Sequence, residues 1–179
     1  PGDMTAIFDP TKTSEEVTKN FAKFFNGSTY CEAGYNAEGC KNLHYSIKYA
    51  KRTQNANGVT GGGSMYRDPR IVLNDGTVIG IRQNAQYKQE QTCSVNPDGS
   101  LKPESVDCSR YTWADITFDV NGYLPPNQFG RDAFTLYVND HNIIPDPTWE
   151  QGGGKSLRSI LSGGGAIYEN YNLGEPWEW

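Results

Sequence analysis

The chain has 179 residues, a formal net charge of −5 and 36% hydrophobic residues. That length suits one domain with a core of ordinary size, and we treat residues 1–179 as a single globular domain. The acidic balance and the lack of any basic run argue against nucleic acid as a partner, because phosphate binding needs clustered Lys and Arg.

The N-terminal end offers no membrane segment of its own. No apolar stretch approaches the roughly 20 residues needed to span a bilayer, and no signal peptide is present. Residues 1–4, Pro-Gly-Asp-Met, look like a cloning remnant. We therefore expect that a leader or a membrane anchor was removed from before the domain.

The strongest helix signal covers residues 13–27. Thr13 and Glu16 have capping-box spacing, and Asn26-Gly27 is typical of a helix stop. An apolar stripe with helical spacing lies between them, formed by Val17, Phe21, Phe24 and Phe25. We expect a short amphipathic helix that packs this stripe on a sheet.

The four cysteines are Cys31, Cys40, Cys93 and Cys108. An even count in a polar chain suggests two disulfides and an oxidising compartment. Three pairings are possible, and Cys31–Cys40 with Cys93–Cys108 is favoured because each closes a short, turn-rich loop. The alternative is a zinc site, which the absence of a short CxxC spacing and of a nearby His disfavours.

Several segments read as strands. Residues 44–50 alternate enough for one strand, and residues 55–65 read as a flexible Gly-rich loop. Residues 71–81 predict a hairpin that turns at Asn74-Asp75-Gly76. Residues 112–120 predict a strand with one buried face, and residues 133–138 predict another. Together they predict an α+β fold, an antiparallel sheet with a helix on one side.

Catalytic motifs are missing. The run at residues 152–156, GGGKS, lacks the earlier Gly of a phosphate loop, and there is no GxSxG, HExxH or GxGxxG. His44 and His141 have no metal-ligand spacing. A carboxylate pair for glycoside hydrolysis stays open, although nothing in the sequence selects one. We expect a protein that is not an enzyme.

Residues 118–134 read FDVNGYLPPNQFGRDAF. This run resembles the D-x-N-G-x-x-x-P-N-x-x-G-x-D-x-F signature in the globular domains of bacterial type IV pilin-like proteins, which include minor pilins and type II secretion pseudopilins. The matching positions are Asp119, Asn121, Gly122, Pro126, Asn127, Gly130, Asp132 and Phe134. The resemblance covers about residues 70–179. The tail is similar to the family's ending, with departures at Tyr171-Asn172 and at Glu178-Trp179.

The resemblance implies a pilin-like head whose truncated N-terminal helix packs on an antiparallel sheet. It implies a structural subunit of a type IV pilus or pseudopilus, whose partners are other pilin-like subunits. Such a subunit is anchored in the inner membrane through its apolar N-terminal helix, here missing, and then assembles into an extracellular pilus or a periplasmic pseudopilus. It does not imply an enzyme.

Three residues of the motif, Asp119, Asn121 and Asp132, offer oxygen atoms to a cation. Calcium takes six to eight hard oxygens, and some pseudopilins that resemble this chain carry calcium in a loop, so calcium is one interpretation. The alternative is a structural turn. In that case Asp119 makes an Asx turn, Asn121-Gly122 a type I′ turn, Pro125-Pro126 stiffens the return, and Arg131 and Asp132 anchor the loop.

A second function stays open beside the fibre subunit. The chain holds 11 Tyr and 4 Trp, and exposed aromatic rings stack on sugars. A secreted carbohydrate-binding or adhesive module, with a glycan or another surface ligand as partner, is therefore the alternative, and it is compatible with a minor pilin at a fibre tip. The structural interpretation is that these rings fill the core of a small sheet. A secreted hydrolase is a third possibility and lacks any motif.

Overall fold

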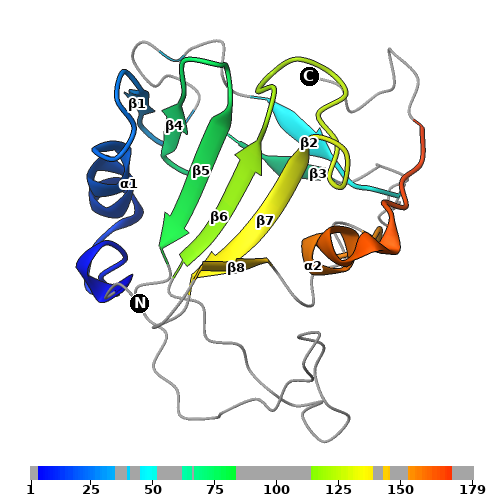
Figure 1. Cartoon of the computed structure of the whole chain (residues 1–179). Helices are drawn as coiled ribbons and strands as arrows, with labels where there is room; N and C mark the ends of the chain where they lie inside the picture. The colour runs from blue at the N-terminus through cyan, green and yellow to red at the C-terminus, as the bar shows by residue number, and fades with distance from the viewer. Residues whose placement is uncertain are drawn as a thin grey trace, which may run out of the picture.

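The computed structural model describes residues 4–34, 40, 45–51, 62–65, 67–83, 114–138, 143–145 and 153–170. Within these residues, a six-stranded antiparallel sheet forms the centre of the molecule and a two-stranded sheet lies on one side of it (Figure 1). The helix α1 covers the other side. The predicted α+β class, with a helix on an antiparallel sheet, is confirmed.

The large sheet has the strand order β1-β4-β5-β6-β7-β8. Its strands are β1 (Thr29–Cys31), β4 (Arg70–Val72), β5 (Val78–Gln83), β6 (Ala114–Asp119), β7 (Ala133–Val138) and β8 (Ile143–Pro145). The predicted hairpin is confirmed as β4 and β5, and its turn uses Gly76 at a φ of +93°. The strand predicted at residues 133–138 is confirmed as β7. The strand predicted at residues 112–120 is confirmed over the shorter span of β6.

The register sends alternate residues to opposite faces of the sheet. Val78 pairs with Asp119, and Asp119 pairs with Ala133, so these residues share one face. Ile79 and Phe118 lie on the other face. Both faces are covered, because α1 packs on one and the two-stranded sheet on the other. The predicted buried face of β6 is confirmed by Ala114 and Ile116, while Asp115 and Thr117 on the opposite face are half-buried and only Asp119, at the end of the strand, is fully buried there.

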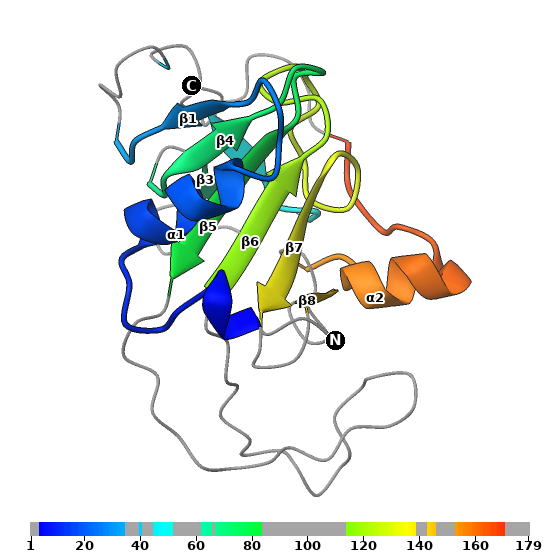
Figure 2. The same ribbon diagram turned by 60° about the vertical axis from the view of Figure 1, so that its left-hand side comes forward.

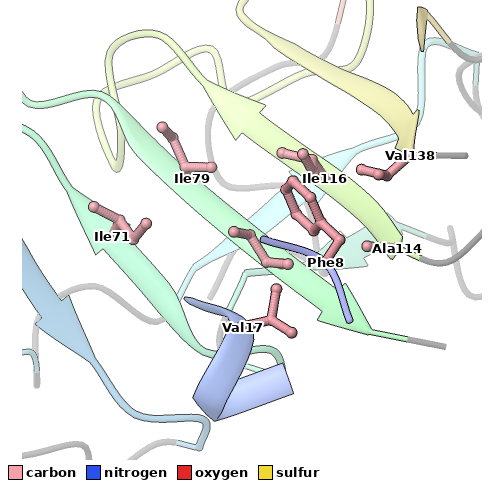
Figure 3. Close-up of a cluster of buried hydrophobic side chains, with 8 residues drawn as sticks. Phe8, Val17, Ile71, Ile79, Ala114, Ile116 and Val138 are labelled. Atoms are coloured by element: carbon pink, nitrogen blue, oxygen red, sulfur yellow. The ribbon is translucent and has the colours of Figure 1, made fainter. Parts of the chain in front are cut away.

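The helix α1 (Ser14–Ala22) starts with the predicted capping box. The hydroxyl of Thr13 accepts from the backbone N–H of Glu16, and the Glu16 carboxylate accepts from the N–H of Thr13. Figure 2 shows α1 lying across the face of β4 and β5. A short 3-10 helix, η1 (Met4–Ala6), precedes it. The core under these helices, seen in Figure 3, consists of Phe8, Val17, Ile71, Ile79, Ile81, Ala114, Ile116 and Val138.

The helix ends before the predicted stop. It ends at Ala22, and a series of i to i−3 hydrogen bonds then carries the chain from Lys23 to Phe25 as tight turns. Phe24 lies beyond the last residue of the helix, and its side chain is 67% exposed. Phe21 and Phe25 remain on the core. The predicted burial of Phe24 is wrong for that reason.

The opposite face is covered by β2 (Ser46–Lys48) and β3 (Gly62–Ser64), which pair antiparallel. The strand predicted at residues 44–50 is thus confirmed in a shorter form. The prediction of a flexible loop over residues 55–65 is wrong for Gly62–Ser64, because these residues form β3. A backbone ladder to β2 forms this strand, and its Gly-Gly-Ser sequence carries no side-chain pattern that would predict it. The core between the sheets consists of Tyr45, Ile47, Met65, Val78, Phe129 and Ala133.

A disulfide joins Cys31, at the end of β1, to Cys40, and the two Cα atoms lie 5.8 Å apart. Both residues are buried. One of the two predicted pairings is therefore confirmed. Cys93 and Cys108 lie outside the described residues, as do His44 and His141.

After β8, the described chain resumes at Gly153. It forms a single helical turn, α2 (Leu157–Ser159), capped by the Ser156 hydroxyl, and a π-helical turn, Ile160–Gly164. In the part of the chain that the structure describes, no helix has the length and apolar character to cross a bilayer.

Candidate functional site

The predicted site is the loop of residues 120–132 that joins β6 to β7. It lies at the same end of the sheet as the turn between β4 and β5, because Val78 pairs with Asp119. The Thr77 hydroxyl donates to the carbonyl of Val120 at 3.1 Å. Gly122 has a φ of +63°, and a Cβ there would lie 2.5 Å from the carbonyl oxygen of Gly76. The motif glycine thus lets loop and hairpin pack backbone against backbone.

Asp119 is fully buried at the start of this loop. Its Oδ1 accepts from the backbone N–H of Asn121 at 3.2 Å. This is the predicted Asx turn, which is confirmed. The predicted type I′ turn at Asn121-Gly122 is wrong, because that turn needs a positive φ at both residues. Among the described residues, the only non-glycine residue with a positive φ is Asn127, so Asn121 does not have the φ that a type I′ turn requires.

Asp132 closes the loop from its other end. Its Oδ2 accepts from the N–H of Asn127 at 2.9 Å, and its Oδ1 accepts from the N–H of Gln128 at 2.7 Å. The Asn127 side chain, from a backbone with a φ of 45°, donates back to the carbonyl of Tyr123 at 3.0 Å. A carboxylate that accepts two backbone N–H groups gives strong, charge-assisted bonds. The predicted anchoring by Asp132 is confirmed.

Arg131 contributes to this anchoring in a different way. Its guanidinium lies over the ring of Tyr168, 4.3 Å from the centroid, in a cation–π contact. It also reaches the Gln128 side-chain oxygen at 3.5 Å. Arg131 therefore connects the loop to the C-terminal segment.

Gln128 is the residue of the loop that the sequence did not single out. It is 1% exposed, and its Nε2 lies within hydrogen-bonding distance of the carbonyls of Tyr49, Ala50 and Glu169. These carbonyls belong to the segment after β2 and to the C-terminal segment. Gln128 thus joins three parts of the chain, and only the folded arrangement reveals that role.

The structure brings Asp119 and Asp132 close enough to repel each other. Burial, followed by the charge of Asp132, raises the pKa of Asp119 to about 7, although the N–H of Asn121 opposes the shift. The Tyr45 hydroxyl faces this carboxylate. Burial and the Asp119 charge raise the pKa of Tyr45 above its ordinary value, so the phenol stays neutral. The contact falls short of hydrogen-bonding geometry, which leaves both Tyr45 Oη and Asp119 Oδ2 without a hydrogen bond.

The geometry bears on a cation in two ways. Both oxygens of Asp132 already accept backbone N–H groups, which suits the turn interpretation. Oδ2 of Asp119 and Oδ1 of Asn121 are buried without a hydrogen-bond partner, and these are the oxygens that a calcium ion would use. In the described part of the chain, no three His, Cys, Asp or Glu side chains are grouped to hold a metal. Calcium at Asp119, Asn121 and Asp132 therefore remains the alternative to the structural turn, and the engaged oxygens of Asp132 favour the turn.

Comparison of the chain with protein-family models, with curated proteins and with solved structures found no match.

Proposed function

We propose that this chain is the globular head of a structural subunit of a bacterial surface fibre of the type IV pilus or pseudopilus kind. The observation that carries the proposal is the loop that holds the pilin-like signature. Gly122 makes the close approach to the hairpin, Asp132 clasps the loop, and the ring of Phe134 packs on Phe118 at 5.5 Å between centroids. Two hydrogen bonds also join matching positions to each other, Asn121 to Asp119 and Asn127 to Asp132, which a chance match of letters would not require.

The arrangement of the elements also supports the proposal. A helix near the N-terminal end packs across an antiparallel sheet, and the signature connects two central strands of that sheet. A helix on an antiparallel sheet is the coarse arrangement that the resemblance implies, although α1 starts with its own cap and is not a truncated helix. The resemblance remains one of sequence pattern and of coarse fold.

The helix α1 refines the proposal. It begins at Ser14 with a complete capping box at Thr13, so it is not the continuation of a helix through the preceding residues. An apolar assembly helix would therefore be a separate element, joined to α1 through the segment that holds η1 and Phe8. Phe8 is fully buried in the core, which would give this joint a fixed anchor on the head.

The Cys31–Cys40 disulfide supports the proposed location, because disulfides persist in oxidising compartments. We place the assembled subunit outside the cytoplasm, in an extracellular pilus or a periplasmic pseudopilus. Other pilin-like subunits are its partners, and it is held in the inner membrane by the preceding helix before assembly.

The experiment that tests this proposal is immunogold electron microscopy with antibodies raised against the purified domain. Cells that express the native gene should carry gold along filaments, and the antigen should sediment with sheared filaments. A strain with the gene deleted is the control for the antibody. Antigen that is secreted into the medium without pelleting with filaments, and that is absent from the cell envelope, would contradict both a pilus subunit and a pseudopilus subunit.

A further inference from the structure

A pocket of about 270 Å³ lies between the large sheet and the layer that contains β2. Its floor is the face of β5, β6 and β7 that carries Gly80, Thr117 and Thr135 in one row. Gly80 has no side chain, which leaves room above β5. The volume lies below the roughly 300–1,000 Å³ of pockets for drug-sized ligands, so the pocket suits a smaller ligand.

Aromatic and sulfur-containing side chains form much of the wall. Tyr49 follows β2 and Tyr137 lies on β7, so the two half-buried tyrosines line the pocket from different layers. Phe129 and Met65, which are both nearly buried, complete this wall. The face of an aromatic ring attracts a cation, and walls with several aromatic rings are those that hold quaternary ammonium groups.

The charged side chains of the pocket add up to one negative charge, because they are Asp68, Arg82 and Asp115. The guanidinium of Arg82 is engaged with Asp68 in a bidentate ion pair, with Nε–Oδ1 and Nη2–Oδ2 distances of 3.1 Å. Since that pair is neutral as a whole, the carboxylate of Asp115 gives the pocket its sign.

Asp115 lies in the middle of a row across the floor. Arg82 is its neighbour on β5 and Tyr137 its neighbour on β7. Asp115 is half-buried, and a carboxylate offers about four acceptor positions, so it can contact a ligand as well as groups of the protein. A cation in the pocket therefore meets a carboxylate and a tyrosine side by side.

Buried charges beneath the pocket keep the same sign. Arg70 shares a row with Gly80, but it is fully buried, does not line the pocket, and donates from Nη1 to the carbonyl of Met65 at 2.8 Å. Asp119 lies on the same face of the sheet, and Asp132 follows in the next loop, both as buried carboxylic acid side chains. These two outnumber the buried guanidinium.

We propose that this pocket binds a small organic cation with a methylated ammonium group, held against Tyr49 and Tyr137 and next to the carboxylate of Asp115. The net charge of the pocket repels an anion, and a neutral ligand of the same shape gains nothing from that charge. The proposal goes beyond the fibre subunit and does not rest on it, because such a pocket would serve a fibre subunit and a secreted module alike.

The test is an NMR titration of the purified domain with choline and with its neutral carbon analogue, in which a tert-butyl group replaces the trimethylammonium group. Choline should shift the backbone amides of Gly80 and Thr117 in a saturable manner. The neutral analogue should bind about tenfold more weakly or worse, the change expected when a ligand loses its charge beside aromatic rings and a carboxylate.

Phosphocholine, which adds the phosphate of a lipid headgroup, distinguishes two sources of such a cation. We expect it to bind more weakly than choline, because its phosphate would lie near Asp68 and Asp115, and this result makes a free solute the source. Binding as tight as that of choline would make a lipid headgroup the source, with the same site for the ammonium group.

Two variants change the charge of the pocket in opposite directions. Asp115→Asn should weaken choline binding about threefold to tenfold, and Arg82→Gln should strengthen it about threefold, because a charge within a few ångströms of the ligand is removed. Two controls change the net charge by the same amounts and should bind like the wild type. They are Asp75→Asn, in the hairpin turn, and Lys23→Gln, at the end of α1 on the opposite face of the sheet.

The opposite signs expected for Asp115→Asn and Arg82→Gln separate an effect of charge from a loss of structure, and the spectra of the free variants show that each keeps the fold. The proposal is overturned if choline leaves the pocket amides unshifted, or if the neutral analogue binds as tightly as choline. It is also overturned if Arg82→Gln weakens the binding of choline.

Discussion

At the scale of single residues, the buried carboxylate of Asp119 dominates the chemistry of the loop. It lies beside Asp132 in a space that excludes water, and one of its oxygens has no hydrogen bond. Its pKa of about 7 means that the folded chain holds a proton there at mildly acidic pH. The loop is therefore a place where protonation and folding are coupled.

The first prediction concerns this coupling. Between pH 4 and pH 7 the folded chain keeps a proton on Asp119 that the unfolded chain releases, so the free energy of unfolding falls as the pH rises through that window. The slope contributed by one such group is at most about 1.4 kcal/mol per pH unit. Urea unfolding at several pH values measures it.

Two substitutions isolate the group. Asp119→Asn should remove this part of the slope. Asp75→Asn should keep it, because Asp75 sits in the hairpin turn and the N–H and hydroxyl of Thr77 lower its pKa, which puts its titration below the window. Equal slopes for the wild type and Asp119→Asn would contradict the assignment.

The second prediction distinguishes a proton from calcium as the group that neutralises Asp119. We expect no calcium binding, because both oxygens of Asp132 are engaged by backbone N–H groups. Calorimetric titration at pH 8, where Asp119 is ionised, should give no heat with calcium, and a chelator should not change the melting temperature. A calcium-dependent rise in melting temperature that Asp119→Asn abolishes would instead establish the metal site.

The third prediction concerns Gly122. An alanine there would put a methyl group into the carbonyl of Gly76, in addition to the strain of a positive φ. We expect Gly122→Ala to lower the free energy of unfolding by about 3 kcal/mol or more. Gly130→Ala is the matched control, since Gly130 has a φ of +83° and nothing lies within 4 Å of its Cβ position.

Gly130→Ala should lower the free energy of unfolding only by the strain of its positive φ, about 1–2 kcal/mol. Chemical denaturation of both variants measures the difference. Equal losses would mean that the close approach between the loop and the hairpin is not needed for stability.

At the scale of elements, the sequence predicted the helix start, the turn and the strand whose formation depends on residues that are neighbours in the chain. The capping box at Thr13, the hairpin at Gly76 and the strand at residues 133–138 all follow from neighbouring residues. The strand β3 does not, because only its pairing with β2 defines it. The prediction that Phe24 is buried was wrong for a related reason, because the helix ends at Ala22, before the last residues of the apolar stripe.

The fourth prediction belongs to α1. Thr13→Ala removes the acceptor for the N–H of Glu16 and should lower the free energy of unfolding by about 1 kcal/mol. Thr13→Ser keeps the hydroxyl and should restore most of the stability. Urea unfolding compares them, and a loss in Thr13→Ser as large as that in Thr13→Ala would exclude the cap as the cause.

At the scale of the whole molecule, long-range contacts decide the site. The sequence located Asp119, Asn121 and Asp132 in one loop, but it could not show that Gln128 reaches a carbonyl near residue 50 and another at Glu169. Nor could it show Tyr45 facing Asp119, because these residues are far apart in the chain. Such contacts follow from the way two sheets stack, for which the sequence carries no local signal.

The central claim is that the domain is the head of a fibre subunit with a separate apolar helix before it. The measurement that tests it most directly is the sequence of the native gene upstream of the codon for Thr5. The fibre proposal predicts a leader peptide followed by a helix of about 20 apolar residues, which would join the head through the segment before α1. An upstream region without such a helix, or a secretory signal cleaved directly before the domain, would contradict it.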